Sequence, residues 1–445
     1  MFPSHSSRPW TSALLALIAI VSLTTRLSAA EPNPCPRNDR CTIWTYYIAA
    51  EPVEWDYAPT GKNAFSGEDL DKVEESAVFA AQDRGRIGRK YQKVVYRQYM
   101  DESFKKIRER PADEEHLGLL GPVLRAEVNQ VIRIVFKNKA KSDYSMHPHG
   151  VWYDKDNEGA DMGPDAGTGS KVAPGDSFTY TWPVPARAGP AERDGDAVIW
   201  AYHSHVSEGD IYDGLYGALV VYAPGVLGDN GLPKLNSRAY PVVREFFLAF
   251  MVGDENASSL LRDNVLKYAQ NTTWTLAEEK ALPPLIQANT TALATMETSD
   301  GFKESNMMHN VNGYFYGNLP GVNMEVGEHV RFYVLAFGNE VDIHSIHWHG
   351  ITIVSEGHRR DVIEALPATF RVADAYVDNP GAWLLHCHVS DHMKAGMMLI
   401  MNITDSKERK TMNDMMAADA PRGMSAGGIG AAAAAVLAGV AALAL

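Results

Sequence analysis

Hydrophobic positions along most of the chain follow the pattern of short β-strands. From residue 43 onward, β-branched and aromatic runs alternate with stretches of Gly, Pro, Asn and Asp. Four such runs are VIRIVFKN (131–138), SFTYTWPV (177–184), AVIWAYHSH (197–205) and GALVVYAP (217–224). Strands of this length between turn residues are typical of β-sandwiches. Helical periodicity is weak except near residues 264–280, so the pattern predicts an all-β fold rather than an α/β layout with crossover helices.

The strand pattern contains an internal repeat with a displacement of 200 residues. SMHPHG at 145–150 recurs as SIHWHG at 345–350. Matching pairs flank it, AEVNQVIRIVF with MEVGEHVRFYV upstream and WAYHSHVSEGD with WLLHCHVSDHM downstream. Such a repeat predicts two copies of one domain. The break falls in the Pro/Gly/Asn stretch APGVLGDNGLPKLNS, which places the first domain at 31–232 and the second at 233–405.

Both ends of the chain predict passage through the secretory pathway. Residues 1–30 combine Arg8, an apolar run at 13–21 and small residues at 28–30, as in a cleaved signal peptide. Residues 406–445 hold a polar spacer and end in an apolar tail, which resembles a glycolipid-anchor signal. A spanning helix usually needs about 20 apolar residues and a basic cytoplasmic flank. We therefore expect a GPI anchor in the outer leaflet of the membrane, on the extracellular face of the cell.

The composition and the cysteine count limit which binding partners and which cellular compartment we expect. With 445 residues, 45% of them hydrophobic, the chain is long enough for two or three globular domains. The formal net charge of -14 argues against a nucleic-acid partner. Of the three cysteines, Cys35 and Cys41 lie in one loop and could close a disulfide, which leaves Cys387 unpaired in a secreted protein. Predicted glycosylation sites, which agree with secretion, are Asn256, Asn271, Asn289 and Asn402.

The segment around Cys387 reads LHCHVSDHMKAGM and offers an explanation for the unpaired cysteine. A thiolate from Cys387, an imidazole from His392 and a thioether from Met397 are ligands of a blue-copper centre, if one more imidazole arrives from elsewhere. On an extended strand, His386 and His388 point away from Cys387, so they could bind different metal ions. The alternative, a buried free cysteine among surface histidines, does not account for so ordered a spacing.

The first copy lacks part of this set. Tyr144 stands in the place of His344, and Ser204 in the place of Cys387, so the first copy is not expected to bind blue copper. It nevertheless keeps two His-x-His pairs, made of His147, His149, His203 and His205. Satisfied core histidines could explain any one of them, but four in paired spacing indicate metal ligands.

Together, the HPHG, HSH, HSIHWHG and HCH motifs resemble the four copper motifs of multicopper oxidases. The resemblance implies two cupredoxin-like, Greek-key β-sandwich domains in tandem, with four copper ions per chain. By this resemblance, His344, Cys387 and His392 would hold type 1 copper, with Met397 as its weak axial ligand. The other ligands would be His147 and His347 for type 2 copper, His149, His203 and His388 for one type 3 ion, and His205, His349 and His386 for the other. Calcium stays open as a further ion, with no site assigned.

Within that superfamily, the chain is most similar to the ceruloplasmin and hephaestin group over nearly all of residues 44–404. The segments that show this similarity are YYIAAEPVEWDYAP, DRGRIGRKYQKVVYRQYMDESF, LGLLGPVLRAEV, ESNMMHNVNGYFYGNLPGV and DNPGAWLLHCHVSDHMKAGM. Members of the group have six such domains, whereas this chain has two, which resemble the first and the last. The implied chemistry is one-electron uptake at type 1 copper and four-electron reduction of dioxygen to water at a buried three-copper cluster.

The resemblance also implies that Fe(II) is the reductant. Ferroxidases of the group use carboxylates and a histidine beside type 1 copper, and the matching positions are Glu304, His309 and Asp391. Hard carboxylate oxygens stabilise Fe(III) more than Fe(II), which drives the electron toward copper. The alternative for Glu304 and Asp391 is that they are ordinary solvated acids. A surface ferroxidase could serve an iron-transport partner that the sequence does not name.

Three other functions are alternatives. A laccase-like oxidase would oxidise phenols in an open apolar pocket and would not require Glu304, His309 or Asp391. A non-catalytic adhesion or cofactor module would be expected to lose cluster ligands, and the sequence keeps all of them. A copper nitrite reductase fits poorly, because its blue site belongs to the first domain and it has no type 3 pair.

The division of the cluster ligands between the two domains predicts the assembly. Each domain holds half of the ligands, so a contact between a first and a second domain must complete the cluster. In the six-domain relatives that contact joins the first domain to the last, and the domains close a ring. Three copies of a two-domain chain would reproduce the ring through a heterologous contact with threefold symmetry, which predicts a homotrimer. The alternative is a monomer whose linker lets its own two domains meet at the cluster.

Overall fold

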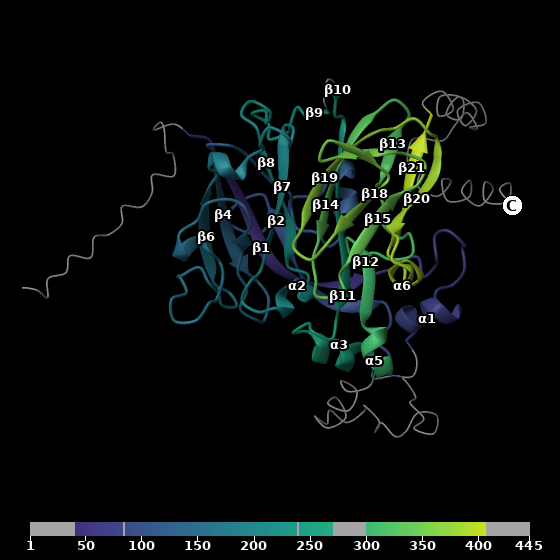
Figure 1. Ribbon diagram of the computed structural model, residues 1–445. Helices are drawn as coiled ribbons and strands as arrows, with labels where there is room; N and C mark the ends of the chain where they lie inside the picture. Colours follow the sequence, from purple (N-terminus) through teal and green to yellow (C-terminus); the bar gives the residue numbers. More distant parts are fainter. Residues whose placement is uncertain (1–40, 83–84, 238–239, 270–299, 406–445) are drawn as a thin grey trace, which may run out of the picture.

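The structure is a computed structural model that describes residues 41–82, 85–237, 240–269 and 300–405. Strands dominate these ranges, which confirms the predicted all-β fold. The predictions for the signal peptide, Cys35, Asn271, Asn289 and the C-terminal spacer and tail fall outside the described residues. Figure 1 shows the strands of the N-terminal half on one side of the molecule and those of the C-terminal half on the other.

The N-terminal half, called the first copy below, contains two four-stranded sheets. Their strand orders are β2-β1-β4-β6 and β3-β8-β7-β5. The strands are β1 (Ile43–Asp56), β2 (Lys90–Tyr99), β3 (Leu124–Glu127), β4 (Val131–Asn138), β5 (His147–Pro148), β6 (Ser177–Pro183), β7 (Ala197–His203) and β8 (Tyr216–Tyr222). One apolar core takes Ile48 and Ile132 from the first sheet and Leu219 and Val221 from the second, as expected for a sandwich.

The C-terminal half, called the second copy, has a six-stranded sheet, β12-β11-β14-β19-β16-β17, and a five-stranded sheet, β13-β21-β20-β15-β18. The strands are β11 (Arg244–Asp254), β12 (Met307–Val311), β13 (Asn323–Glu325), β14 (His329–Ala336), β15 (His344–Trp348), β16 (Ile353–Ser355), β17 (His358–Arg360), β18 (Val362–Ala365), β19 (Phe370–Tyr376), β20 (Gly381–Cys387) and β21 (Met398–Thr404). A pair of short strands, β9 (Asn236–Ser237) and β10 (Tyr240–Pro241), lies between the copies. The domain boundaries stay predictions.

The two copies repeat one plan of strand pairing. β1 runs parallel to β4 as β11 runs parallel to β14, and β7 pairs antiparallel with β8 as β20 pairs with β21. In both copies, the strand with the first histidine motif pairs with the strand that ends at the second motif. His147 faces His203, and His347 faces His386. This register brings together motifs that are far apart in the sequence.

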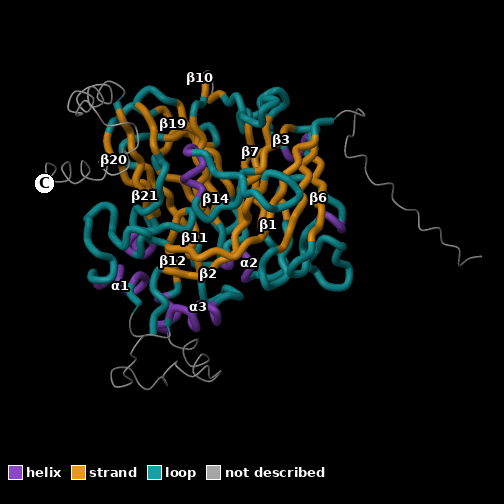
Figure 2. Tube along the Cα trace, turned by 180° about the vertical axis from the view of Figure 1, so that it is seen from behind, coloured by secondary structure: helices purple, strands orange, loops and turns teal. Residues whose placement is uncertain are grey.

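Short helices lie in the connections between strands. They are α1 (Glu74–Ala80), η1 (Ala112–Leu117), η2 (Lys155–Asn157), η3 (Ala186–Ala188), α2 (Gly209–Asp213), α3 (Leu261–Tyr268), α5 (Asp300–Ser305) and α6 (Ser390–Lys394). Figures 1 and 2 show α1 and α3 at the same end of the molecule. Across the described ranges, no helix has the length and apolar character needed to cross a membrane.

A large apolar contact, the junction, joins the two copies within the chain. Its members include Tyr222 of the first copy and Phe247 and Tyr333 of the second, and the rings of Phe247 and Tyr333 stack with centroids 4.7 Å apart. Arg331 crosses the same contact, with Nη1 at 2.5 Å from Oδ1 of Asp196. Burial of one large apolar side chain contributes about 1.5–3 kcal/mol. Because several such side chains are buried here, the two copies are held in one fixed contact.

Candidate metal centres

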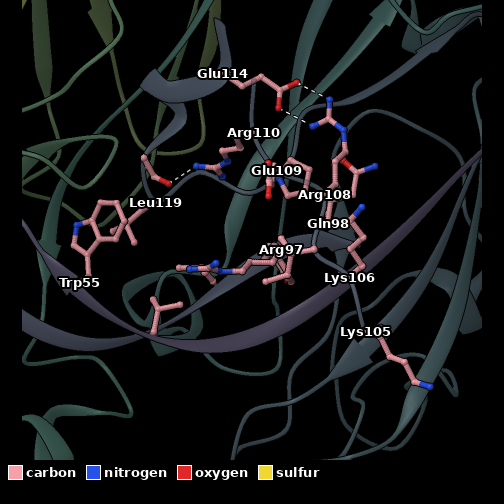
Figure 3. Close-up of a pocket in the computed structure, with 16 residues that line it drawn as sticks. Trp55, Arg97, Gln98, Lys105, Lys106, Arg108, Glu109, Arg110, Glu114 and Leu119 are labelled. Atoms are coloured by element: carbon pink, nitrogen blue, oxygen red, sulfur yellow. Dashed lines mark hydrogen bonds and ion pairs between the residues drawn. The ribbon is translucent and has the colours of Figure 1, made fainter. Parts of the chain in front are cut away.

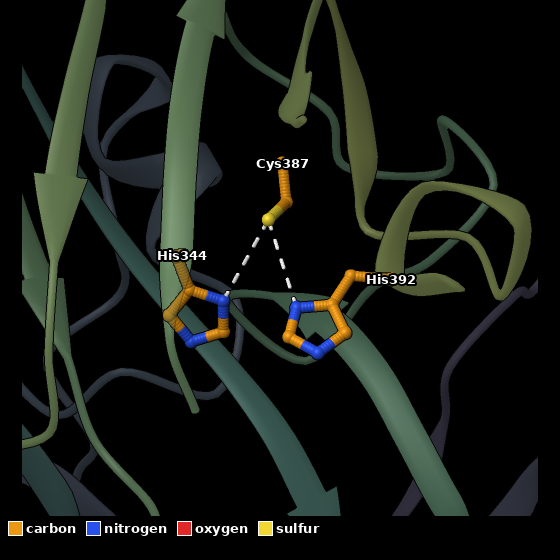
Figure 4. A group of neighbouring side chains, drawn as sticks. All are labelled: His344, Cys387 and His392. Carbon is orange, nitrogen blue, oxygen red and sulfur yellow. Dashed lines mark hydrogen bonds between the residues drawn. The ribbon is translucent and has the colours of Figure 1, made fainter. Parts of the chain in front are cut away.

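Three buried side chains from separate elements of the second copy converge. His344 begins β15, Cys387 ends β20 and His392 lies in α6. Sγ of Cys387 is 3.8 Å from Nδ1 of His344 and 3.6 Å from Nδ1 of His392 (Figure 4). Met397 is fully buried in the same apolar cluster as Cys387, and its backbone N–H donates to the carbonyl of His392 at 3.0 Å. The structure thus brings the predicted type 1 ligands into one buried region.

The donor set of this group suits copper. Burial alone would raise the pKa of Cys387, but contacts with His344 and His392 and with backbone N–H groups lower it to about 6. The thiolate, which is the metal-binding form of cysteine, is therefore accessible near neutral pH. One soft sulfur with two imidazole nitrogens is a combination that selects copper.

A buried carboxylate lies behind His344. Oδ1 of Asp342 is 3.2 Å from Nε2 of His344, and both side chains are fully buried. The backbone N–H groups of Val252 and Asn339 donate to the two carboxylate oxygens at 2.6 and 2.9 Å. Burial alone would lower the pKa of His344, but Asp342 and Cys387 together raise it. The sequence analysis missed Asp342. Its position two residues before the predicted ligand His344 is the one signal that could have drawn attention to it.

Four histidines of the first copy form a compact group, called the first quartet. His147 begins β5 and His203 ends β7, while His149 and His205 follow these strands. Nε2 of His149 is 3.1 Å from Nε2 of His203, whose Nδ1 is 2.8 Å from the carbonyl of Ser204. The ring centroid of His205 is 5.1 Å from that of His147. Burial lowers the pKa of His149 to about 4 and that of His203 to about 3, so both rings are neutral and able to bind a metal.

The second quartet, of the second copy, repeats this geometry. Nε2 of His349 is 3.1 Å from Nε2 of His386, whose Nδ1 is 2.8 Å from the carbonyl of Cys387. Ligand nitrogens of His347, His349 and His386 all lie within 4.8 Å of one another, and the ring centroid of His388 is 5.5 Å from that of His386. Because the Nδ1–H of His386 donates to a carbonyl, its Nε2 presents a lone pair toward His349. A cation between these nitrogens fits the arrangement.

The two quartets do not meet within one chain. Among the residues that the structure describes, no ring contact joins a histidine of one quartet to a histidine of the other. His149 packs against Phe370 of β19, with ring centroids 5.4 Å apart. The second quartet borders a surface hollow lined in part by His347, His349 and Trp383. One chain therefore presents two half sites, whereas the predicted type 2 and type 3 sets draw ligands from both copies.

The residues predicted to receive iron belong to the second copy. His309 on β12 is buried, and its ring centroid is 5.2 Å from that of His392. Glu304 in α5 and Asp391 in α6 are exposed, and Figure 1 shows these helices in the same lower part of the second copy. In the described part of the chain, no hydrogen bond or ion pair joins either carboxylate to His309. The structure thus places His309 against a predicted type 1 ligand and leaves both carboxylates open to solvent.

In the first copy, a hydrogen-bonded network occupies the place of the type 1 group. The hydroxyl of Tyr144 donates to Asp213 at 2.7 Å, and the hydroxyl of Ser204 donates to Asp210 at 2.6 Å. Both carboxylates are buried. Sequence reasoning noted Tyr144 and Ser204 as replacements and missed the two aspartates that satisfy their hydroxyl groups.

The remaining predicted sites are only partly within the described residues. The amide nitrogen of Asn256 donates to the carboxylate of Asp254 at 2.8 Å. That of Asn402 donates to a neighbouring asparagine side chain at 3.1 Å. Cys41 is disulfide-bonded, while Cys35 lies outside the described ranges. The glycans and the pairing of Cys41 with Cys35 stay predictions.

Two family models match the chain. One model described as multicopper oxidase matches residues 117–225, and a second with the same description matches residues 287–407. Together they cover just over half of the chain. All of the predicted copper ligands, and the three residues predicted to receive iron, fall within the matched ranges.

Several proteins are similar to most of the chain. Ferroxidase HEPHL1 of Mus musculus is 39% identical over 361 residues, which are 80% of this chain and 29% of that protein. Hephaestin of Mus musculus is 38% identical over 378 residues, 84% of this chain and 30% of that protein. Ceruloplasmin of Rattus norvegicus is 40% identical over 358 residues, 79% of this chain and 31% of that protein. The chain thus spans about a third of the length of these relatives.

Solved structures align with lower identity. A crystal structure of a multicopper oxidase is 17% identical, covers 81% of this chain and 88% of its own, and has a TM-score of 0.46. Copper nitrite reductase from Nitrosomonas europaea is 15% identical, covers 82% of this chain and 94% of its own, and has a TM-score of 0.47. Likenesses of this size carry no argument about function.

Proposed function

The chain belongs to the multicopper oxidase family, and from that premise we propose that it is a ferroxidase, which oxidises Fe(II) to Fe(III) and reduces dioxygen to water. The observation that carries the proposal is the contact between His309 and His392, with ring centroids 5.2 Å apart. This contact links His309, one of the three predicted iron residues, to a predicted type 1 ligand. The relatives named ferroxidase, hephaestin and ceruloplasmin support the same activity.

Copper is the cofactor of this family, and when bound it supplies one-electron uptake at the thiolate site and four-electron reduction of dioxygen at the cluster. The residues of the chain supply position and shielding. His386 and His388 are covalent neighbours of Cys387, so the thiolate ligand and two cluster ligands share one stretch of backbone. His344 and His392 are buried, which limits the access of water to the Cys387 thiolate.

Glu304 and Asp391 would bind Fe(II) as substrate. Both side chains are exposed, so a hydrated ion can reach them, and hard carboxylate oxygens favour the Fe(III) product. Nδ1 of His309 contacts the carbonyl of Met307 at 2.9 Å, which leaves Nε2 as the free nitrogen. Because burial lowers the pKa of His309 to about 4, its ring stays neutral beside His392.

The test compares the oxidation rates of Fe(II) and of a bulky phenol. A Glu304→Ala, Asp391→Ala double variant should lose at least about tenfold in kcat/KM for Fe(II) and keep phenol oxidation within about twofold. Glu192→Ala with Asp229→Ala removes two exposed acids from the first copy and is the matched control for net charge. Equal losses on both substrates would remove the case for an iron site and favour a laccase-like oxidase. Copper content with the ultraviolet band of a type 3 pair separates either oxidase from a non-catalytic module.

The assembly that we propose is a homotrimer in which each cluster is completed between two chains. Two observations support it. The quartets stand apart within one chain, and the second borders a surface hollow. The junction already holds the two copies of one chain in a different contact, through Tyr222, Phe247 and Tyr333. A monomer would have to break the junction to bring its own quartets together.

Mixing of two inactive variants tests the shared cluster. One chain carries His147→Ala with His149→Ala, and the other carries His347→Ala with His349→Ala. A hybrid trimer contains an interface between two intact half sites, so the mixture should regain part of the activity, while each variant alone stays inactive. Native mass spectrometry shows whether hybrids have formed. Hybrids without activity would contradict the shared cluster.

For location, we propose secretion and a GPI anchor in the outer leaflet, where the enzyme could serve an iron-transport partner. The support is in the sequence, in the signal-like residues 1–30 and in residues 406–445, where a polar spacer precedes the apolar tail of residues 431–445. Phosphoinositide-specific phospholipase should release active enzyme from intact cells. Retention of the enzyme with a lipid that is known to be cleavable would favour a spanning tail.

A further inference from the structure

A cavity of about 680 Å³, called the basic pocket, lies in the first copy apart from the histidine groups. Strands β1 and β2 and the segment from Lys105 to Pro122 line it. The lining includes five basic side chains and two acidic ones, an excess of three positive charges in a chain whose net charge is -14. The local charge is therefore opposite to that of the whole protein.

Arg110 is held in this pocket without a carboxylate partner. Its Nη1 donates to the carbonyl of Gly118 at 2.6 Å, and its Nη2 donates to the carbonyl of Leu120. Among the described residues, no acidic side chain forms an ion pair with Arg110. Loss of hydration lowers the pKa of Arg110, the negative charge of Glu114 raises it, and the positive charge of Arg97 lowers it further. Two cations thus stand close enough to repel each other.

The two guanidinium groups face the same side of the pocket. Figure 3 shows Arg97 and Arg110 extending toward Trp55, whereas Lys105 points away from them. Arg108 is already neutralised, because its Nη1 and Nη2 contact the carboxylate of Glu114 at 2.8 and 3.2 Å. Arg97 and Arg110 are therefore the guanidinium groups that remain for a ligand. The ion pair of Arg97 is longer, 3.6 Å to Glu51, which is outside the lining.

We propose that the basic pocket binds a small multivalent anion, whose carboxylate or phosphate oxygens are shared by Arg97 and Arg110. Guanidinium groups match such oxygens with paired, charge-assisted hydrogen bonds. An anion between two like charges also replaces their repulsion by attraction. The size of the cavity favours a free small molecule over a folded partner.

Binding at this place should stabilise the contact between the copies. The backbone N–H of Leu119 donates to the carbonyl of Asn312 at 2.9 Å, and Nε1 of Trp55 donates to the carbonyl of Gly313 at 2.6 Å. Leu119 lies between the two carbonyls that Arg110 holds. An anion that fixes Arg110 therefore also fixes a segment that touches the second copy.

Calorimetric titration of the copper-loaded protein at constant ionic strength tests the proposal. The probes are inorganic phosphate and benzene-1,3,5-tricarboxylate. The carboxylates of the second probe lie too far apart for two of them to bind one copper ion, so it does not strip the protein of copper by chelation. Saturable binding of either probe supports the site, and the preferred probe distinguishes carboxylate from phosphate ligands. Arg97→Gln and Arg110→Gln should each weaken binding at least about tenfold, whereas Lys234→Gln, which makes the same charge change at an exposed lysine outside the lining, should stay within about twofold.

Two results would overturn the proposal. One is the absence of saturable binding by both probes. The other is an equal loss in Lys234→Gln, which would indicate general charge attraction and no defined site. If Arg110→Gln unfolds because two carbonyls lose their donor, Arg97→Gln alone decides, since Arg97 holds no backbone group among the described residues. The thermal midpoint should rise with the bound probe in wild type and not in Arg97→Gln.

Discussion

Cys387 in the second copy and Ser204 in the first occupy the same backbone position with different surroundings. The N–H of Cys387 donates to the carbonyl of Met397, and the N–H of Ser204 donates to that of Leu215, both at 3.1 Å. Leu215 therefore stands where the second copy has its predicted axial ligand. The backbone hydrogen bonding is the same in both copies. A few side chains therefore decide whether this position holds metal ligands, as in the second copy, or a hydrogen-bond network, as in the first.

In the first copy, the side chains at this position form a hydrogen-bond network around Asp213, called the tie below. Asp213 is fully buried and accepts from the hydroxyl of Tyr144. It also accepts from the hydroxyl of Ser258 at 2.6 Å and from the backbone N–H and hydroxyl of Ser259 at 2.9 and 2.6 Å. The serines belong to the second copy, so the network links the two copies. The first copy has neither the imidazoles nor the thiolate of the second at this position, and its network stabilises the contact between the copies instead of taking up electrons.

The strongest test of this comparison exchanges the two residues. Cys387→Ser should abolish blue absorption and bring turnover to background, because the hydroxyl is a poor ligand where a thiolate is needed. Ser204→Cys should leave the first copy without a second blue centre, because Tyr144 and Asp210 offer no imidazole there. Absorption spectra, copper content and steady-state rates measure both. Survival of the blue band in Cys387→Ser would show that the ligand assignment is wrong.

The next test removes the tie. Asp213→Ala leaves the buried hydroxyls of Tyr144 and Ser258 without their acceptor, and each unsatisfied buried group costs about 1–3 kcal/mol. We expect the free energy of unfolding in urea to fall by about 3 kcal/mol while the blue absorption stays. Asp229→Ala, at an exposed acid of the first copy, is the control and should change stability by less than about 0.5 kcal/mol. A loss of blue absorption together with stability would mean that the two places are not independent.

The grouping of the histidines could be anticipated from the sequence because strand geometry restricts it, whereas the assignment of each ligand to a copper ion rests on the family resemblance and stays a prediction. His-x-His spacing on neighbouring strands puts alternate residues on one face, and the pairing of His347 with His386 follows from the same register. The roles of Asp342 and Asp213 could not be predicted in this way. An acid near a turn is usually solvated, and only the packing of distant backbone N–H groups or hydroxyls around these two makes them buried acceptors.

The sequence motifs also could not predict that the two histidine quartets lie apart within one chain. The motifs show which residues can bind metal, but they do not show which faces of the two copies touch. That choice depends on the junction, where the stacked rings of Phe247 and Tyr333 of the second copy share one apolar cluster with Tyr222 of the first. Such side chains alternate with others of similar hydrophobicity along the same strands, so the sequence offers no signal that distinguishes an internal contact from a contact with a second chain.

His116 provides a test of the contact between the copies that involves no predicted ligand. Its Nε2 accepts from the backbone N–H of Phe247 at 3.0 Å, and burial lowers its pKa to about 4. In the unfolded chain the pKa is about 6.5, so as pH falls the unfolded state binds the proton first. The stabilisation is complete above pH 6.5 and is lost as pH falls toward 4, by up to about 3 kcal/mol.

His116→Gln keeps an acceptor and removes this titration. Urea unfolding of wild type and variant between pH 7.5 and 4.5 should therefore show a smaller loss of stability in the variant. His358→Gln, at an exposed histidine of the second copy, is the control and should follow wild type. Parallel curves for wild type and His116→Gln would mean that His116 is protonated without opening the contact.

The smallest expected effect concerns Asp342, which the second copy has two residues before His344 and the first copy replaces with Ser142. A buried negative charge 3.2 Å from Nε2 of His344, the ring nitrogen that faces away from Cys387, stabilises the oxidised, more positive metal centre through the imidazole. Asp342→Asn should therefore raise the reduction potential of type 1 copper, by about 30–60 mV, where 59 mV is a tenfold change for one electron. Redox titration of the blue band measures the shift.

Glu364→Gln is the matched control, because it removes one negative charge from β18, the strand that pairs with β15. Its side chain is 68% exposed, so solvent screens it, and the potential should move by less than about 10 mV. An equal shift in both variants would show that the potential responds to net charge alone. An unchanged potential in Asp342→Asn, with the blue band intact, would show that the carboxylate only orients the imidazole. A rise confined to Asp342→Asn would mean that the second copy differs from the first in the buried charge beside its ligands as well as in the ligands themselves.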